Sequence, residues 1–194
     1  MPLLKICGLT RIEDALAARG ADMLGVVLEP SSPRVGSLTL LRDIKSEVKV
    51  PAVAVRVSGS LEEMFDLARD ADYLQIHRVL TNDELEALSS YEKRKILYVP
   101  ADLKFLNYLK NACERGDLVL VDSPSKTSAT DLKVAAVMLS ECSKAGLAGG
   151  IGLDNLDSYL KLQPYFLDVS RGVEISPGVK DHRKLRELIR RVKG

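Results

Sequence analysis

Eight short, β-rich runs that alternate with longer helical segments are the feature that most constrains the fold of this chain. The runs cover residues 3–7, 23–28, 52–57, 73–77, 95–99, 118–122, 147–149 and 166–170. Between them, apolar residues recur at the spacing of an amphipathic helix, as at Leu61, Met64, Phe65 and Ala68. Strand and helix in alternation predict parallel strands joined by right-handed crossovers.

Helix starts follow the strands directly. Thr10, Ser60 and Thr81 each stand three residues before a glutamate, which predicts a capping box at each position. Eight strand–helix units predict closure into a (β/α)8 TIM barrel. The alternative, a doubly wound open sheet, usually has five or six strands and a glycine-rich turn after the first strand, and the chain has neither feature.

Length and composition fit one compact domain. The 194 residues fall slightly below the roughly 200–400 residues of most such barrels, so we expect short helices and loops. No linker rich in Pro, Gly or Ser divides the chain, and residues 1–194 are therefore predicted to form a single barrel domain. The formal net charge of +1 gives no electrostatic reason to expect a nucleic-acid partner.

The three cysteines are far apart and form no CxxC pair. This usage argues against a disulfide framework or a zinc site, and it favours a reducing compartment. Cys113 and Cys142 fall in helical segments, where we expect them to be packing residues. No apolar run approaches the roughly 18 residues of a membrane span, and the N-terminus lacks the pattern of a signal peptide. The sequence therefore predicts a cytoplasmic protein without a membrane partner.

Polar residues mark several predicted strand ends, which is where barrels of this type carry their function. Cys7, His77 and Asp122 close three of the runs, and Asp168 lies near the end of another. A cysteine that closes a strand is by itself usually a small buried hydrophobe. Buried polar strand ends, however, are costly without partners, and their number here raises the expectation of a site.

Lys5 and Cys7 share one face of the first predicted strand, because side chains alternate along a strand. The apolar Leu4 and Ile6 should face the helices, so Lys5 and Cys7 should point into the barrel. There the ammonium would draw the thiol below its free pKa of about 8.5 and favour the thiolate. The alternative is a structural lysine paired with a carboxylate.

Two glycine-bearing turns follow the last two predicted strands. One contains Gly149 and Gly150, and the other is Ser170, Arg171 and Gly172. Glycines let backbone N–H groups approach an anion, and barrels of this type often bind phosphate in these two loops. A third loop, residues 29–37, is stiffened by two prolines and presents Arg34, whose guanidinium suits a carboxylate. The polar loop at residues 123–130 carries Lys126 and could be a lid or only a connector.

Together these motifs resemble the phosphoribosylanthranilate isomerase family of tryptophan biosynthesis, in the same order and over nearly the whole chain. The matching residues are Lys5-Ile6-Cys7-Gly8-Leu9-Thr10, Glu13-Asp14-Ala15, Gly20-Ala21-Asp22, Ser32-Pro33-Arg34, Gln75-Ile76-His77, Val121-Asp122, Gly149-Gly150-Ile151, Asp168-Val169-Ser170, Gly172-Val173-Glu174 and Pro177-Gly178. The opening motif and the Asp-Val-Ser-x-Gly-Val-Glu motif are the most specific.

The resemblance implies an aldose–ketose isomerase that performs an Amadori rearrangement of N-(5-phosphoribosyl)anthranilate. By likeness, Asp122 would protonate the ring oxygen as general acid, and Cys7 would remove the C2' proton as general base. Such a pair needs one group protonated and the other deprotonated, so their environments should adjust the two pKa values to these tasks. No metal or organic cofactor is implied.

The resemblance also assigns the binding residues. Arg34 would hold the anthranilate carboxylate, the turns at Gly149-Gly150 and Ser170-Arg171-Gly172 would hold the phosphate, and His77, Asp168 and Lys5 would line the substrate pocket. The implied partner is this small-molecule substrate. We expect a monomer or a homodimer.

Some positions depart from the family pattern. The family usually has a glycine-rich stretch and Gly-Lys-Thr-Phe-Asp-Trp after the sixth strand, whereas here Ser125-Lys126-Thr127 is followed by Ser128-Ala129-Thr130-Asp131. Arg56, Arg78 and Arg171 replace uncharged residues near the expected mouth. These changes leave two alternatives open. One is a sugar-phosphate enzyme with shifted specificity, such as an aminoaldose isomerase of histidine biosynthesis, against which Cys7 argues; the other is a non-catalytic barrel that binds a phosphorylated ligand.

Overall fold

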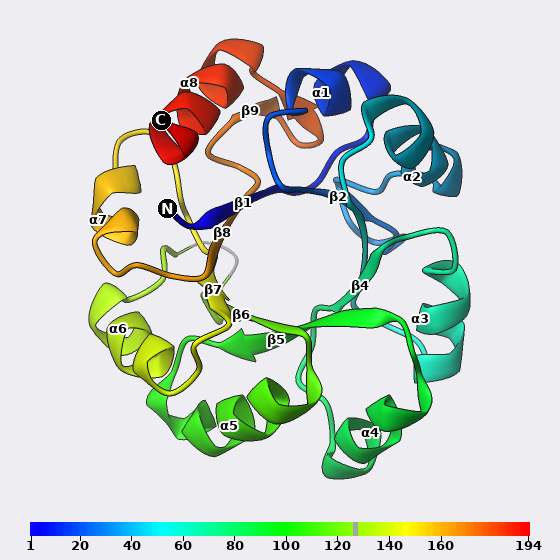
Figure 1. The fold of residues 1–194 in the computed structure, drawn as a ribbon, viewed down its shortest axis with the longest axis vertical. Coiled ribbons are helices and arrows are strands. Elements are labelled where there is room, and N and C mark those ends of the chain that lie inside the picture. Colours follow the sequence, from blue (N-terminus) through cyan, green and yellow to red (C-terminus); the bar gives the residue numbers. More distant parts are fainter. Residues whose placement is uncertain (126–127) are drawn as a thin grey trace.

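The computed structural model describes every residue except 126 and 127, so Lys126 lies outside the described residues. In this described part, eight parallel strands close into a barrel in chain order, and β1 pairs with β8 (Figure 1). The strands are β1 (Leu3–Ile6), β2 (Met23–Val27), β3 (Ala52–Arg56), β4 (Tyr73–Ile76), β5 (Arg94–Pro100), β6 (Leu118–Asp122), β7 (Ala145–Leu147) and β8 (Phe166–Val169). The predicted (β/α)8 barrel is confirmed.

Helices form the outer ring (Figure 1). They are α1 (Ile12–Ala17), α2 (Leu38–Asp43), α3 (Leu61–Leu67), α4 (Asn82–Ala87), α5 (Leu106–Arg115), α6 (Leu132–Ser140), α7 (Leu156–Leu160) and α8 (His182–Lys193), with the short helices η1 (Ile44–Val48), η2 (Leu88–Ser90) and η3 (Leu103–Phe105). Most have fewer than ten residues, as the chain length predicts. No helix in the described part of the chain is long and apolar enough to cross a membrane.

Capping explains where two of the helices begin. Ser60 and Thr81 form the predicted capping boxes with Glu63 and Glu84. The predicted box at Thr10 is wrong, because α1 begins one residue later than that box requires, with Arg11 as N-cap. The Thr10 hydroxyl instead donates to the backbone oxygen of Gly178, 2.6 Å away.

Alternation along β1 sorts its side chains as predicted. Leu4 and Ile6 are fully buried in the layer between strands and helices. Cys7 lies in a separate cluster inside the barrel, with residues such as Met23 and Phe166. Lys5 is also completely buried on this inner side, where it contacts Asp168 of β8. Residues from neighbouring strands therefore meet inside the barrel, as its layered packing requires.

A hairpin between β8 and α8 was not predicted. It consists of β9 (Glu174–Ser176) and β10 (Val179–Lys180), which pair antiparallel. Figure 1 shows it beside α1 and α8. Its strands are too short to produce a recognisable alternation of apolar and polar residues. It supplies Glu174 and Lys180, two charged residues that contact Arg34 and Cys7.

Cys113 and Cys142 form a disulfide, so the prediction that they are only packing residues is wrong. The bridge joins α5 to the segment after α6, with a Cα–Cα distance of 6.0 Å. Spacing in the sequence gave no sign of it, because the two residues become neighbours only when adjacent helices pack around the barrel. Intracellular disulfides are known from hyperthermophiles. Cysteine usage therefore no longer supports the prediction of a reducing compartment.

Candidate active site

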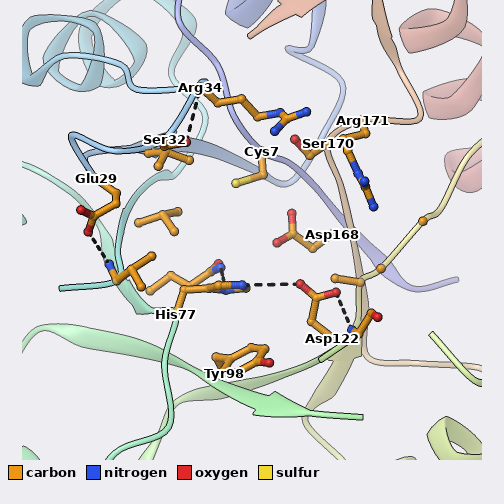
Figure 2. A pocket seen from close by; sticks show the side chains of 18 of the residues that line it. Cys7, Glu29, Ser32, Arg34, His77, Tyr98, Asp122, Asp168, Ser170 and Arg171 are labelled. Atoms are coloured by element: carbon orange, nitrogen blue, oxygen red, sulfur yellow. Dashed lines mark hydrogen bonds and ion pairs between the residues drawn. The ribbon is translucent and has the colours of Figure 1, made fainter. Parts of the chain in front are cut away.

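A cavity of about 610 Å³ opens at the carboxyl ends of the strands (Figure 2). This volume lies within the range of small-molecule sites. Its lining includes all of the predicted site residues except Lys5, namely Cys7, Arg34, His77, Asp122, Gly149, Gly150, Asp168, Ser170, Arg171 and Gly172. Within the described residues, no group of His, Cys, Asp and Glu is arranged to hold a metal ion.

Lys5 lies beneath the cavity and supports its floor. Its Nζ donates to Asp168 Oδ2 at 2.8 Å, across adjacent strands that place the two residues in register. Burial lowers the pKa of Lys5, but Asp168 and Cys7 together outweigh that effect and the net pKa is raised. Lys5 therefore stays an ammonium, and it matches the alternative of a structural lysine paired with a carboxylate.

Asp168 presents an acceptor to the cavity. Its Oδ2 is bound to Lys5, whereas its Oδ1 is buried and has no hydrogen-bond partner among the described residues. An unpaired carboxylate oxygen is costly to bury. A hydroxyl group of a bound ligand would supply the missing donor.

Cys7 is buried, with 7% of its surface exposed, and its sulfur points into the cavity (Figure 2). Gly25 of β2 makes room for it, because a Cβ there would lie 2.8 Å from the Cys7 sulfur. Burial raises the pKa of the thiol, and the opposing effect of the Lys5 charge is too small to reverse it. The prediction that Lys5 draws this pKa below its free value is therefore wrong. Burial of the thiol is the main reason, and the Asp168 carboxylate, which offsets the Lys5 charge, raises the pKa further.

Asp122 lies at the end of β6 with an unusually basic carboxylate. Burial, reinforced by the negative charge of Asp168, raises its pKa to about 6, although the Ser123 N–H donates to Oδ1 at 2.7 Å. The ring nitrogen Nε2 of His77 lies 3.6 Å from Asp122 Oδ2 (Figure 2). A carboxyl group with this pKa keeps a proton far more readily than an ordinary aspartate at neutral pH.

Two cavity residues beside His77 were not predicted as site residues. Gln75 donates its amide to His77 Nδ1 at 3.1 Å, and the Tyr98 ring packs against the imidazole with centroids 4.5 Å apart. The sequence does indicate Gln75, because side chains alternate along a strand and Gln75 therefore points to the same inner side as His77, two positions further on. Tyr98 likewise follows the inward alternation of β5, but an aromatic residue at such a position is usually only part of the core.

Arg34 reaches the cavity from the loop after β2, as predicted, but its guanidinium is not free. Nε and Nη2 donate to the Glu174 carboxylate at 2.8–3.1 Å. Its own backbone N–H donates to the Ser32 hydroxyl, which stiffens the loop (Figure 2). Glu174 was not predicted as a site residue, although it belongs to one of the family-like motifs. The hairpin that brings it to Arg34 leaves no periodic signal in the sequence.

The two glycine-bearing turns lie against each other, joined by a bridge between Gly152 and Gly172. Gly149 and Gly150 have φ values of 92° and 76°, a region that favours glycine. A Cβ at Gly172 would lie 2.0 Å from the Ile151 backbone oxygen, so only glycine fits this approach. The Arg171 side chain extends along the cavity wall (Figure 2). Glycine-bearing turns and a guanidinium together suit a phosphate.

The other two unusual arginines lie at the rim rather than in the cavity lining. Arg78 forms a bidentate pair with Glu84 at 2.6 and 2.8 Å, which lowers the pKa of that carboxyl group to about 2. Arg56 lies 3.9 Å from Glu29 and donates to the backbone oxygens of Leu28 and Ser58. Nearby carboxylates therefore offset both charges, and of the three positions only Arg171 adds charge to the cavity itself.

Comparisons with known proteins agree with this geometry. A sequence model of the family described as N-(5'phosphoribosyl)anthranilate (PRA) isomerase matches residues 4–191. The N-(5'-phosphoribosyl)anthranilate isomerase of Sulfolobus acidocaldarius is 38% identical, over 100% of this chain and 97% of that protein.

Two solved structures are similar over the full length of both chains. A phosphoribosyl anthranilate isomerase in complex with reduced 1-(o-carboxyphenylamino)-1-deoxyribulose 5-phosphate is 29% identical, with a TM-score of 0.87. Monomers generated from the dimeric phosphoribosylanthranilate isomerase of Thermotoga maritima are 28% identical, with a TM-score of 0.88.

Proposed function

The chain belongs to the N-(5'-phosphoribosyl)anthranilate isomerase family, and we propose that Cys7 and Asp122 are the general base and general acid of its reaction. The chain is an aldose–ketose isomerase of tryptophan biosynthesis. It converts the aminoaldose N-(5-phosphoribosyl)anthranilate into the 1-(2-carboxyphenylamino)-1-deoxyribulose 5-phosphate ketose. The observation that carries the assignment is the placement of a buried thiol and a carboxyl group of raised pKa in one cavity.

Asp122 begins the reaction. It protonates the furanose ring oxygen, the bond from C1' to that oxygen breaks, and the anthranilate nitrogen supplies the electron pair that forms a Schiff base. With a pKa of about 6, roughly a tenth of the Asp122 carboxyl groups are protonated at pH 7. An aspartate with its ordinary pKa would be protonated about a hundredfold less often.

Cys7 then acts on the carbon next to the Schiff base. Its thiolate removes the C2' proton, the electrons of that C–H bond form an enolamine, and the enolamine tautomerises to the ketone as C1' gains a proton. The raised pKa of Cys7 makes the thiolate scarce but strongly basic, which suits removal of a proton from carbon. The Lys5 ammonium provides the nearby positive charge that stabilises this thiolate.

The remaining cavity residues bind the substrate. Arg34 directs the donors that Glu174 leaves unoccupied toward the anthranilate carboxylate, and Asp168 Oδ1 accepts a hydrogen bond from a sugar hydroxyl. His77 lines the pocket beside Asp122. The turns at Gly149-Gly150 and Ser170-Arg171-Gly172 hold the phosphate. Lys5, predicted to contact the substrate, acts from below through Asp168 and Cys7.

The setting of the reaction follows from the family. As a member of a biosynthetic family, the enzyme works in the cytoplasm on a small-molecule substrate. It functions as a monomer or a homodimer, the two forms named for the Thermotoga maritima relative.

Loss of the substrate's anthranilate fluorescence, followed in wild type, Cys7→Ser and Asp122→Asn, tests the assignment. Each substitution is expected to lower kcat by about 10²–10⁴-fold. Asp66→Asn, which changes a largely exposed carboxylate on α3, is the matched control and should retain full activity. Turnover that survives both site substitutions would refute the mechanism. A wild type that binds phosphorylated ligands but shows no turnover would favour a binding protein.

A further inference from the structure

Lys180 is a fully buried lysine outside the cavity lining, and the mechanism above does not use it. Its side chain is 0% exposed. Nζ donates to the backbone oxygens of Cys7 and Ser170 at 2.6 and 3.2 Å, and to Glu174 Oε1 at 2.9 Å. An ammonium has three donors, and here each has an acceptor. Two of these acceptors belong to residues of the proposed site, and the third belongs to the carboxylate that binds Arg34.

Through the backbone oxygens, Lys180 ties together two strand ends. Cys7 directly follows β1, and Ser170 is the first residue of the phosphate turn after β8. The packing between them is tight, because a Cβ at Gly8 would lie 2.8 Å from Arg34 Cδ and 2.9 Å from the Ser170 hydroxyl. The ammonium therefore fixes the backbone that carries the base relative to the backbone that carries the phosphate turn.

Through Glu174, Lys180 also sets the net charge of the cluster that contains Arg34. The Glu174 side chain is 5% exposed and contacts both cations. The pair of Arg34 and Glu174 alone would be neutral and would attract an anion weakly. Lys180 adds a second positive charge, so the cluster of three keeps a net charge of +1 beside the cavity. That positive charge attracts an anionic substrate carboxylate and so strengthens its binding.

Lys180 is itself held in place from the opposite side. Its backbone N–H donates to Asp14 Oδ2 at 3.0 Å, and Asp14 is fully buried on α1. The same carboxylate binds His182 at 2.8 Å and Arg11 at 2.7 Å. Because Asp14 of α1 anchors the backbone of Lys180, the lysine has little freedom to move if Glu174 or the Cys7 backbone shifts.

We propose that Lys180 is a positioning residue that fixes the Cys7 backbone and, through Glu174, holds Arg34 in the direction, and the cluster at the net positive charge, that select a carboxylate-bearing substrate. This inference rests on the proposed roles of Cys7 and Arg34. It assigns the β9–β10 hairpin a function in substrate selection that the barrel alone does not provide.

The test compares two substrates in three proteins. The substrates are phosphoribosylanthranilate and its aniline counterpart, which lacks the carboxylate; the proteins are wild type, Lys180→Met and Lys193→Met. Lys193 is the control because it pairs with Asp22, which precedes β2 at the end of the barrel opposite the cavity. We expect Lys180→Met to lower kcat/KM at least tenfold more for the anthranilate compound than for the aniline compound, the loss of about one charge-assisted interaction. Lys193→Met should leave both unchanged.

The pH dependence of Cys7 alkylation by iodoacetamide is a second readout that does not depend on turnover. Cys7 is the one free thiol of the described chain, and Lys5 of β1, Asp168 of β8 and Lys180 of β10 face it. Without the Lys180 charge, alkylation should require a higher pH, whereas Lys180→Arg should stay close to wild type. Lys180→Gln, which keeps a donor but not the charge, replaces Lys180→Met if that variant does not fold.

Equal losses for the two substrates, with an unchanged alkylation profile, would overturn the inference and leave Lys180 a purely structural residue. A wild type without preference for the anthranilate compound would instead contradict the role of Arg34, and a wild type without turnover would contradict the proposed mechanism. The three failures are therefore distinguishable.

Discussion

Replacement of Asp122 by Asn is expected to stabilise the fold while it removes the general acid. In the folded chain, burial and the nearby charge of Asp168 raise the pKa of Asp122 from 3.8 to about 6. Between these values the folded state binds more protons at this site than the unfolded state does. The free energy of unfolding therefore falls as the pH rises from about 4 through 6, and above 6 the ionised carboxylate is a constant cost.

The size of the cost follows from the two pKa values. At 1.36 kcal/mol per pKa unit, a rise from 3.8 to about 6 corresponds to roughly 3 kcal/mol at pH 8. Asn has nearly the same shape, and its side-chain oxygen can still accept the Ser123 N–H bond. The weaker contact with His77 subtracts from the gain. We expect Asp122→Asn to raise the free energy of unfolding by about 1–3 kcal/mol at pH 8, and by little at pH 4.

Urea unfolding followed by far-UV circular dichroism at pH 4 and pH 8 measures both values. The midpoint should rise at pH 8 without a change in the slope m, because the surface exposed on unfolding stays the same. The control Asp66→Asn changes a side chain that is 72% exposed and should shift neither midpoint. A gain of equal size at both pH values would refute the reasoning, since it would then not arise from ionisation of Asp122.

Three further predictions concern catalysis and stability. The reaction needs protonated Asp122 and ionised Cys7. As the pH is raised, kcat/KM should therefore increase tenfold per pH unit up to about pH 6, stay level up to the raised pKa of the thiol, and fall above it. A value of kcat/KM that increases as the pH drops through 6 would contradict this. Cys113→Ser should lower the free energy of unfolding by about 3–4 kcal/mol, because it opens a disulfide between residues 29 positions apart. Addition of a reductant to wild type should have the same effect, and denaturant titrations measure both. Gly149→Ala should lower the free energy of unfolding by about 1–3 kcal/mol and weaken the binding of inorganic phosphate, because φ is +92° and the new Cβ would lie 2.2 Å from the Thr130 hydroxyl. The control is Gly152→Ala, whose Cβ would meet nothing closer than 3.6 Å. In calorimetry this control should unfold and bind phosphate nearly as wild type does.

The sequence contains enough local information to predict the barrel and most of its cavity. Alternation in β1 correctly separates Leu4 and Ile6 from Lys5 and Cys7, and the polar strand ends meet because parallel strands of a barrel end on one side. Strand limits differ more at β7, where the prediction of 147–149 is replaced by Ala145–Leu147. The positive φ values of Gly149 and Gly150 turn the chain there, and the apolar run does not show it.

Pairings between distant residues are the part that local patterns do not contain. Arg34 and Glu174 are separated by 140 positions and meet because a short hairpin returns to the loop after β1, where Gly178 contacts Thr10. The same hairpin takes the Thr10 hydroxyl away from its predicted capping box. At Thr10 a tertiary contact replaces the partner that the neighbouring sequence suggests, and no periodicity records this contact or the one between Arg34 and Glu174.

The balance of charge inside the barrel explains how one cavity can contain both a strong base and an available acid. The Asp168 carboxylate contributes to a raised pKa at Cys7 and at Asp122, because it disfavours a second negative charge on either side. Transfer of a proton from the thiol to Asp122 leaves the net charge of the site unchanged and moves the negative charge from Asp122 to Cys7. There it lies beside two ammonium groups, Lys5 and Lys180, whose charges lower the pKa of the thiol. The catalytic form is thus a rearrangement of protons already in the site, and its population should not depend on pH between the two pKa values.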